Sequence, residues 1–376
     1  MSKTKICHIT TIHERYDVRI FEKECRSLSA AGYDTTLIVN DEQPNEIKYG
    51  IRIISTHKKT KNRLSRMLKD QFLVYKLAKR ENADIYHVHD PELLPICALL
   101  RKNAHVIFDS HEFTVKQILI KEYLPTFVRK SIAGIYAFLE KLILPKLSAI
   151  IVPTTLDGDA YFDRFGPPVM LINNYPSLRE AEEVGRPGLD EDDKKGYACY
   201  LGSLTYARGL QQMIEAARLS GVQLVLGGNY SPEDILEELN KMQSEGVGSY
   251  LGEINRKEVR SVLMKAGMGL SLLQDKGQYA HLDNLSTKVY EYMQSSLPVI
   301  ISDFPYVQRL LKKYPFGIAV DPSDPEEIAQ AMRFIRDNPE ITKKMGEAGL
   351  RAVLEEFNWE KEAEKLIVLY RKLEEI

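Results

Sequence analysis

The chain has 376 residues, of which 44% are hydrophobic and 28% are charged, and its formal net charge is −2. This length predicts two domains. The composition excludes a disordered chain, which would bury too little apolar surface to offset its loss of conformational entropy. The four cysteines are widely spaced, which excludes a disulfide scaffold. A net charge near zero argues against a general nucleic-acid binder.

The N-terminal apolar stretch, Ile6–Ile9, is short and contains a histidine. It is too short for the hydrophobic region of a signal peptide, and no run of about 18 apolar residues follows it. We therefore expect a cytoplasmic protein, which can still rest on the inner face of the plasma membrane.

Short apolar segments alternate with segments of helical periodicity along the first half of the chain. The predicted strands are Lys5–Thr10, Asp34–Val39, Ile51–Ile54, Ile85–His89, Val106–Asp109 and Ala149–Pro153. Strands that are apolar on both faces and alternate with helices indicate a parallel sheet covered by helices on both sides.

The alternation stops near Asn173, and a segment rich in Pro, Gly and charge continues to Lys195, which we interpret as a linker. It restarts with predicted strands at Ala198–Leu201, Val222–Leu226, Tyr250–Leu251, Met268–Ser271, Val299–Ile301 and Gly317–Ala319. The last segment, Trp359–Leu373, has the pattern of an amphipathic helix. Two such halves predict a two-lobed α/β protein with a ligand cleft at the carboxyl ends of its strands.

The first motif of the second half joins a strand to a helix through a glycine turn. The strand ends at Gly202, Ser203 follows, and a helix begins near Gly209, with Leu210, Met213, Ile214 and Ala217 as its apolar face. Glycine lets backbone approach a ligand, and Arg208 adds a positive charge where helix amides favour an anion. An ordinary turn between a strand and a helix explains the same pattern.

A second helix start lies at Ser286-Thr287-Lys288, with Glu291 one turn later. Ser286 or Thr287 can cap the helix, and Lys288 with the first amides can hold a phosphate. The carboxylate of Glu291 can accept both hydroxyls of a ribose. A solvated helix end with a Lys–Glu contact is the alternative.

Polar clusters also follow two strands of the first half, at His87-Val-His89-Asp90 and at Asp109-Ser-His111. Zinc ligation by His87, His89 and His111 is one interpretation, although no Cys or His-x-x-x-His helix accompanies them. Contacts to a sugar are the interpretation we favour, because function gathers at the carboxyl ends of parallel strands.

The segment after the first strand is rich in polar side chains: His13, Arg15, Asp17 and Arg19. We expect Arg15 and Arg19 to face the rim of the cleft, and ordinary surface arginines are the alternative. Asp157-Gly158-Asp159 follows a Pro-Thr-Thr turn, so helix capping explains it without a metal. A glycine pair ending at Gly228 indicates a turn near the ligand, since the GxGxxG pattern of dinucleotide sites is absent.

Together these motifs resemble glycosyltransferase family 4, the retaining nucleotide-sugar enzymes of the GT-B fold, and most closely its members from bacterial surface-polysaccharide pathways. The resemblance covers nearly the whole chain and rests on Arg19–Leu28, Val88–Leu93, Tyr200–Leu204, Lys288–Met293 and Asn358–Leu366. It implies two Rossmann-like domains facing across a cleft. Residues 1–175 would form the acceptor side and 176–358 the donor side, with the C-terminal helix, about 359–376, crossing back to the first domain.

The resemblance also assigns roles on the donor side. The family's Glu-x7-Glu element falls on Asp283 and Glu291, so that Glu291 would hold the ribose and Asp283 the sugar hydroxyls. Arg208 falls on a diphosphate-binding basic residue. Ser203 stands where the family often has a second basic residue, which Lys288 would replace. The full donor-binding set is Gly202, Ser203, Arg208, Gly228, Ser286, Thr287, Lys288 and Glu291.

On the acceptor side, His111 matches the histidine that meets the transferred sugar. The family's Gly-Gly loop near the N-terminus is replaced by His13–Asp17. The implied catalytic residues are His111, Asp283 and Arg208, and the acceptor-side residues are His13, Arg15, Asp17, Arg19 and His89. The resemblance implies no cofactor and no metal. A nucleotide-sugar 2-epimerase and a catalytically silent sugar-nucleotide-binding protein are the alternative functions.

The segment from His57 to Arg80 holds nine Lys and Arg residues against one acid. Interleaved apolar residues make it typical of a helix on an anionic membrane surface, although a solvated helix packed on the sheet is the alternative. Residues 1–175 hold 26 Lys and Arg against 20 Asp and Glu, whereas the rest holds 25 against 33. The positive net charge of residues 1–175 is therefore compatible with binding to an anionic membrane surface. A UDP-sugar donor and a saccharide or polyprenyl-linked acceptor are the expected partners, with no nucleic acid.

Overall fold

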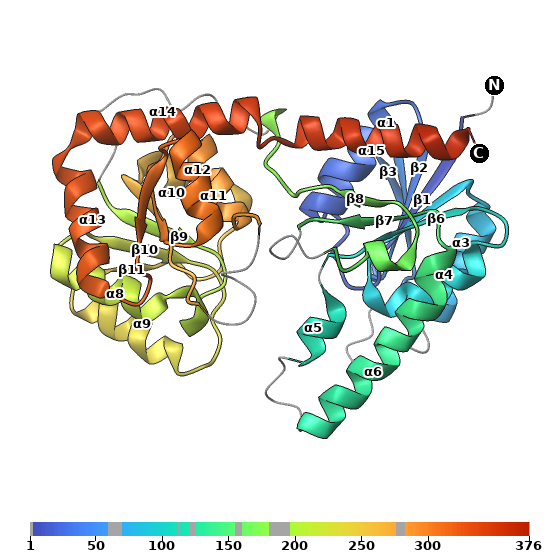
Figure 1. The fold of residues 1–376 in the computed structure, drawn as a ribbon, viewed down its shortest axis with the longest axis horizontal. Coiled ribbons are helices and arrows are strands. Elements are labelled where there is room, and N and C mark those ends of the chain that lie inside the picture. The colour runs from blue at the N-terminus through green and yellow to red at the C-terminus, as the bar shows by residue number, and fades with distance from the viewer. Residues whose placement is uncertain are drawn as a thin grey trace. The chain divides into compact units, whose positions relative to one another are not determined.

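A computed structural model describes residues 3–58, 70–111, 113–119, 125–154, 160–179, 196–275 and 283–375. The chain forms two compact units, one of Met1–Asn174 with Glu360–Ile376 and one of Tyr175–Trp359. Each unit is a sheet with helices packed on both faces (Figure 1); the sheet of the first unit is parallel except at one edge, and that of the second is parallel throughout. The predicted α/β class with two Rossmann-like domains is therefore confirmed.

The sheet of the first unit has the strand order β3-β4-β2-β1-β5-β6-β7-β8. Its strands are β1 (Lys5–Ile9), β2 (Asp34–Val39), β3 (Glu46–Lys48), β4 (Ile51–Ser55), β5 (Ile85–Val88), β6 (His105–Asp109), β7 (Ala149–Val152) and β8 (Val169–Leu171). All neighbours pair in parallel except β3 with β4. The two edge strands β3 and β8 are three residues long, partly exposed and absent from the predicted strands: β3 (Glu-Ile-Lys) has no apolar run, and β8 (Val-Met-Leu) is apolar but short.

Helices cover both faces of this first sheet. They are the π-helix η1 (Val18–Cys25), α1 (Arg26–Ala30), α3 (Gln71–Glu81), α4 (Leu94–Leu100), α5 (Thr114–Leu119), α6 (Thr126–Ile143) and α15 (Trp359–Glu374). Short 3₁₀ turns lie at Pro91–Leu93, Leu144–Lys146 and Asp163–Phe165. Figure 1 shows α1 and α15 on one side of the sheet and α3 and α4 on the other.

The C-terminal helix α15 packs on the first unit, as predicted. The hydroxyl of Tyr33 donates to Glu374 over 3.2 Å, and the ring of Tyr370 lies against that of Tyr33. The backbone amide of Asn173 donates to Glu362 over 2.9 Å. Helix α15 therefore completes a domain that began more than 300 residues earlier in the chain.

The sheet of the second unit has the order β11-β10-β9-β12-β13-β14, and all its pairs are parallel. Its strands are β9 (Ala198–Leu201), β10 (Leu224–Gly227), β11 (Gly248–Tyr250), β12 (Met268–Ser271), β13 (Val299–Ser302) and β14 (Gly317–Val320). Its helices are α8 (Leu210–Ser220), α9 (Ile235–Ser244), α10 (Arg256–Lys265), α11 (Thr287–Gln294), α12 (Pro305–Lys313), α13 (Pro325–Asp337) and α14 (Pro339–Glu355), with a 3₁₀ turn at Tyr206–Arg208.

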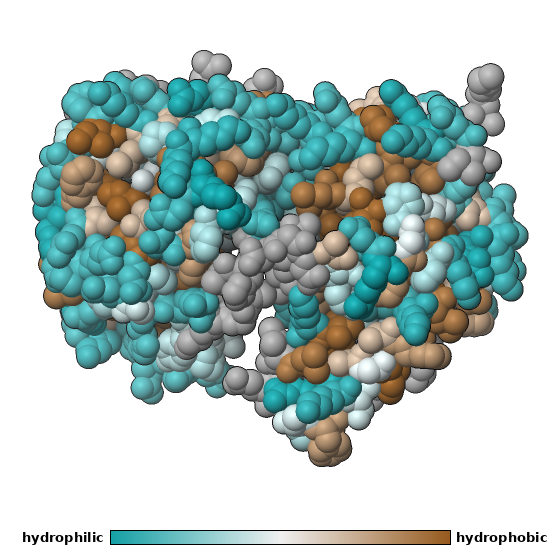
Figure 2. Space-filling model, viewed as in Figure 1, coloured by the Kyte–Doolittle hydropathy of each residue, from teal (hydrophilic) through white to brown (hydrophobic). Residues whose placement is uncertain are grey.

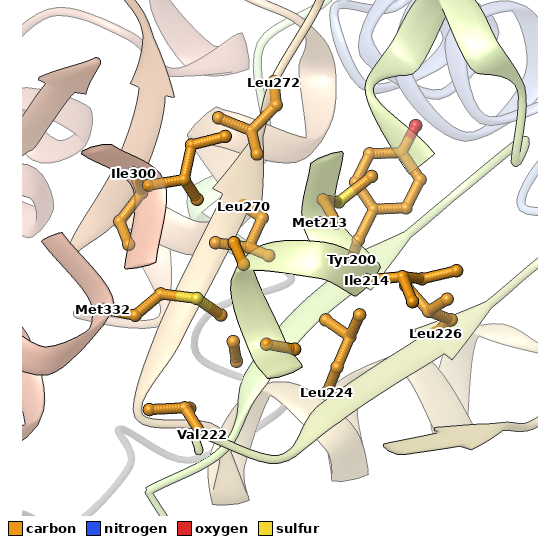
Figure 3. Close-up of a cluster of buried hydrophobic side chains, with 14 of the residues drawn as sticks. Tyr200, Met213, Ile214, Val222, Leu224, Leu226, Leu270, Leu272, Ile300 and Met332 are labelled. Atoms are coloured by element: carbon orange, nitrogen blue, oxygen red, sulfur yellow. The ribbon is translucent and has the colours of Figure 1, made fainter. Parts of the chain in front are cut away.

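Two hydrophobic clusters sandwich this second sheet. Figure 3 shows the first, in which Met213 and Ile214 of α8 meet Leu270 of β12 and Met332 of α13. The apolar face predicted for α8 is buried throughout. Close packing of this kind fixes the strands, and hence the loops that leave their carboxyl ends, where the candidate site lies.

Candidate functional site

Two glycine turns lie side by side at the carboxyl ends of β9 and β10. Gly202 has φ 141° and Gly228 has φ 126°, values that favour glycine. A Cβ built on Gly228 would lie 2.2 Å from the carbonyl oxygen of Gly202, and one on Gly202 would lie 3.1 Å from Cε of Lys288. Side chains are therefore excluded here, because the two turns pack closely on each other and on Lys288, while both glycines remain partly exposed.

Arg208 ends a 3₁₀ turn directly before Gly209, and α8 begins at Leu210 as predicted. Gly209 has φ 76°, and a Cβ there would lie 2.4 Å from the carbonyl oxygen of Leu272. Gln274, which the sequence did not single out, holds this loop. Its backbone amide donates to Ala207 over 2.9 Å and its side chain to Pro322 over 2.7 Å. Arg208 is thereby fixed at the amino end of α8, where an anion is favoured.

Lys288 lies in the first turn of α11 and is only 8% exposed. Its ammonium group stands 4.7 Å from the ring centre of Tyr200, and it makes no side-chain hydrogen bond or ion pair with another described residue. Burial and, to a smaller extent, the charge of Arg208 lower the pKa of Lys288 to about 7, against the opposing effect of Glu291. Two cationic side chains therefore share one small region, where a bound anion would stabilise both charges.

The start of α11 differs from the prediction in one respect. The helix begins at Thr287, which is exposed, and Ser286 is its N-cap residue, but no side chain caps the helix. The hydroxyl of Ser286 instead lies 3.4 Å from that of Ser271. Capping by Ser286 or Thr287 was therefore a wrong prediction, because the serine pairs with the neighbouring strand end.

The two carboxylates of this region each contact an arginine at the surface. Glu291 accepts a hydrogen bond from Arg256 of α10 over 2.6 Å, in place of the alternative contact with Lys288. Asp283 accepts from Arg309 of α12 over 2.5 Å. Both arginines are about half exposed, so these ion pairs contribute little to stability and can exchange for ligand hydroxyls at small cost.

The first unit carries its polar side chains in its interior. Four of these side chains are each 0% exposed: His8 of β1, Glu24 of η1, His87 of β5 and His89 directly after β5. Nδ1 of His8 lies 3.0 Å from Nε2 of His89, and Glu24 Oε2 lies 3.8 Å from both nitrogens. We call His8, Glu24, His87 and His89 the buried histidine cluster.

Arg19 and Asp109 border this cluster. The guanidinium of Arg19 donates to Asp109 over 2.8 and 3.1 Å and lies 3.1 Å from Glu24. Burial alone would raise the pKa of Asp109, but the charge of Arg19 holds it well below its usual range. Burial raises the pKa of Glu24 well above its usual range, against the pull of Arg19. The guanidinium of Arg19 and the carboxylate of Asp109 thus pair inside the unit.

His111 forms the outer edge of the polar residues, with 19% of its side chain exposed. Its Nε2 lies 3.3 Å from Nδ1 of His89, and its ring stands 4.8 Å from that of His13. Burial lowers the pKa of His111 to about 3 even though Asp109 opposes the shift, so the imidazole is neutral. A neutral ring can position a polar ligand but carries no charge to it.

His13 and Asp17 lie beside His111. Nδ1 of His13 is 3.2 Å from Asp17, whose carboxylate also accepts from the amides of Arg19 and Ile20 and so caps η1. Burial opposes protonation of His13, but Asp17 and Asp90 outweigh it and raise the pKa of His13. These side chains are partly exposed and form the accessible part of the first unit's polar region.

Three predicted acceptor-side residues are less accessible than the sequence suggested. Arg15 is 5% exposed and donates to Asp41 and Glu46, whereas Arg19 is 4% exposed and donates to Asp109. The expectation that both arginines face one rim is therefore wrong. His89 lies behind His111 in the interior. Arg15, Arg19 and His89 all contact partners that are buried or half-buried. A residue that binds an acceptor at the surface would not need such partners.

Glu24 and Tyr370 were not singled out from the sequence. Glu24 falls four residues after Ile20 and four before Leu28, so helical spacing places it on the same face as two apolar residues, and a carboxylate on such a face is a usable signal. Tyr370, whose hydroxyl lies 2.9 Å from Nδ1 of His87, is 283 residues away in the chain. No local pattern points to that contact.

Two family models match the chain. Residues 18–175 match the model described as Glycosyltransferase Family 4, and residues 182–352 match that described as Glycosyl transferases group 1. A sucrose synthase of Acidithiobacillus caldus is 25% identical over 231 residues, which are 54% of this chain and 28% of that protein. The match therefore spans little more than a quarter of that relative's length.

Solved structures resemble the whole chain in fold. A sucrose-phosphate synthase from Thermosynechococcus elongatus has a TM-score of 0.74 at 18% identity, and the match covers 99% of both chains. HepE of Anabaena, in complex with UDP and glucose, has a TM-score of 0.68 at 12% identity over 98% of this chain and 100% of that one. A glycosyltransferase from Rickettsia africae has a TM-score of 0.67 at 14% identity, covering 99% of each.

Proposed function

Because this chain is a glycosyltransferase of the GT-B fold, with a family 4 segment followed by a group 1 segment, we propose that it moves a sugar from a UDP-sugar to a saccharide hydroxyl with retention at the anomeric carbon. The observation that carries the proposal is that two cationic side chains, Arg208 and the buried Lys288, lie in one region beside the turns at Gly202 and Gly228. Two cations and exposed backbone are what a nucleoside diphosphate requires.

The charge that develops during transfer lies on the leaving diphosphate. Arg208, Lys288 and the amides at the starts of α8 and α11 are suited to stabilise it, and this arrangement needs no metal ion at the diphosphate. The sugar–phosphate bond breaks and a bond to the acceptor oxygen forms on the same face of the sugar. A phosphate oxygen of the leaving group takes the acceptor proton.

Two carboxylates and one histidine would orient the substrates. Glu291 would release Arg256 and accept the ribose hydroxyls, and Asp283 would release Arg309 for the hydroxyls of the sugar. The neutral ring of His111 would position the transferred sugar. None of these groups serves as a covalent nucleophile in this scheme.

Alanine substitution of Arg208 or Glu291 tests the donor site. Each should lower kcat/KM for transfer by about 100-fold or more, because charge or ribose contacts are lost in the transition state. Arg218→Ala is a matched control at the far end of α8, where Arg218 pairs with Glu215 and Glu245 at the surface. Melting temperatures should be the same for all variants. Near-normal transfer in both site variants would refute the assignment, and release of free UDP without acceptor would favour a 2-epimerase.

The acceptor side carries an exposed apolar stripe along α6. Its members are Phe127, Ile135, Phe138 and Leu142, which are 73%, 64%, 65% and 49% exposed. Lys130 and Lys141 lie on the same helix, and Figure 2 shows hydrophobic and hydrophilic side chains alternating over its region. No helix among the described residues has both the length and the apolar character needed to cross a bilayer.

Residues 59–69 of the basic segment predicted at the membrane, His57–Arg80, lie outside the described residues. Its described end forms α3, which buries Val74 and Ala78 against the sheet as the alternative interpretation expects. The stripe on α6 therefore supports the proposal better. We propose that it docks on the anionic inner face of the plasma membrane, where a polyprenyl-linked acceptor for surface-polysaccharide synthesis would lie.

Liposome co-sedimentation tests this docking. The wild type should bind vesicles that contain anionic lipid and bind neutral vesicles less, and Phe138→Ser should weaken binding by removing buried apolar area. Phe334→Ser is a control, since Phe334 is an exposed phenylalanine on α13 of the other unit. Equal binding to both kinds of vesicle would count against docking.

A further inference from the structure

The buried histidine cluster has the arrangement of a metal site. One ligand atom from each of His8, Glu24, His87 and His89 lies within 4.8 Å of the others. Nδ1 of His8 and Nε2 of His89 are 3.0 Å apart, and Glu24 Oε2 is 3.8 Å from each. Ligand atoms about 2.0–2.1 Å from a tetrahedral zinc ion are roughly 3.3 Å apart. The three printed separations lie within about 0.5 Å of this value and those to His87 are no more than 4.8 Å, so rotation of the His87 ring and small shifts of the other side chains would complete the site.

Three buried atoms of this cluster lack a hydrogen bond within the described part of the chain. They are both carboxylate oxygens of Glu24 and Nε2 of His87. More than nine in ten buried polar atoms in proteins have such a partner. Oε1 of Glu24 already faces the guanidinium of Arg19 at 3.1 Å, so a metal ion would supply the missing partner of Oε2 and of Nε2 of His87.

The opposite nitrogens of the histidines are already oriented by other groups. The hydroxyl of Tyr370 lies 2.9 Å from Nδ1 of His87 and 3.4 Å from Nε2 of His8, and its two lone pairs can accept from both. Nδ1 of His89 lies 3.6 Å from Asp109. Histidines that bind metals usually donate their second N–H in this way, which fixes the ring and its tautomer.

We propose that His8, Glu24, His87 and His89 bind a divalent transition-metal ion, with zinc as the ion that three imidazoles and one carboxylate suit best. The four side chains are fully buried and leave no open position for a substrate, so the ion holds β1, β5 and η1 together and takes no part in transfer. The proposal does not depend on the donor site, which lies in the second unit.

A second group of close ligand atoms, from His89, Asp109 and His111, fits a cation less well. Asp109 already receives two hydrogen bonds from Arg19 on Oδ2, the oxygen that lies 3.6 Å from His89 and from His111. The zinc interpretation of the sequence, with His87, His89 and His111, thus keeps two of its ligands. His8 and Glu24 replace the third.

Metal analysis of the full chain tests the proposal. Protein expressed with added ZnCl2 and purified without chelator should hold about one zinc ion per chain. Glu24→Gln and His87→Gln keep the size of the side chain and should reduce the zinc content by about tenfold or more. His105→Gln is the matched control, since His105 lies on β6, contacts Ser148 and is outside the cluster. It should retain the zinc of the wild type.

The wild type alone decides the matter if the variants fold poorly. A chelator in mild urea should remove the ion. After the chelator and the urea have been removed, added ZnCl2 should restore about one ion per chain and raise Tm, whereas added MgCl2 should not. A wild type that takes up less than about 0.1 zinc per chain, with the same Tm in ZnCl2 and MgCl2, would overturn the proposal. Equal zinc in the wild type and in folded cluster variants would overturn it as well.

Discussion

The two units place polar side chains at the same topological position, the carboxyl ends of parallel strands, but use them differently. In the first unit these groups are buried and contact one another, as Arg19 contacts Asp109 and Glu24. In the second unit, Glu291 and Asp283 contact arginines that are about half exposed. Buried partners resist exchange, whereas exposed partners give way to a ligand. The first arrangement therefore favours stability and shape, and the second is the one suited to the proposed binding of a ligand.

Removing one arginine from each unit should separate these roles most clearly. Arg19→Ala leaves Asp109 buried without its cation and should lower the free energy of unfolding by about 3–5 kcal/mol. Arg256→Ala breaks an exposed ion pair and should lower the free energy of unfolding by no more than about 1 kcal/mol. Urea unfolding followed by circular dichroism measures both. Similar losses in the two variants would contradict the contrast between the units.

The glycine turns offer a second test within the donor unit alone. Gly228→Ala would place a Cβ 2.2 Å from the carbonyl oxygen of Gly202, so the two turns must separate. Gly246→Ala is the control, because Gly246 also has a positive φ, 70°, but no atom lies within 4 Å of its Cβ position.

In Gly246→Ala, strain of the left-handed backbone alone should lower the free energy of unfolding by about 1–2 kcal/mol, and the affinity for UDP should be unchanged. Gly228→Ala should be less stable than this control. It should also bind UDP at least about tenfold more weakly, because the backbone of the displaced turns can no longer contact the ligand. Calorimetric titration with UDP gives the affinities. Equal affinities would mean that the turns do not line the donor site.

Lys288 should make UDP binding depend on pH. Its pKa is lowered by burial to about 7, so the free protein loses this charge as the pH rises above 7. A bound diphosphate favours the ammonium form, and binding therefore takes up a proton. Affinity should fall as the pH rises from 7 to 9, by up to about tenfold per unit.

Lys288→Arg is the control for this effect, because the guanidinium stays charged throughout that range. Its UDP affinity should change little between pH 7 and 9, even if it is weaker at every pH. A wild type as flat as this variant would show that Lys288 does not carry the binding charge.

Local patterns were enough to predict the inner strands and the two glycine turns of the second unit. The start of α8 after Gly209 and the apolar face that includes Met213 follow from glycine chemistry and helical spacing within about ten residues. The partners of these residues could not be predicted in this way. Glu291 meets Arg256 from 35 residues away, and His87 meets Tyr370 from 283 residues away. Such contacts depend on how whole helices pack on the sheet, which no short segment encodes.

Buried charge was the other difficulty. Sequence reasoning places arginines such as Arg15 and Arg19 at the surface, because burying an unpaired guanidinium is costly. Here the acids Asp41 and Asp109, from distant strand ends, remove that cost. A buried arginine becomes predictable only when its acid is known, and that pairing is a property of the fold.

The return of α15 to the first unit also sets the order in which the protein can be built. The ribosome produces all of Tyr175–Trp359 before the residues that supply Tyr370. The second unit can therefore complete its core on a nascent chain while the first still exposes the surface around Tyr33 and His87 that α15 covers. The domain that starts first during translation is the last to be finished.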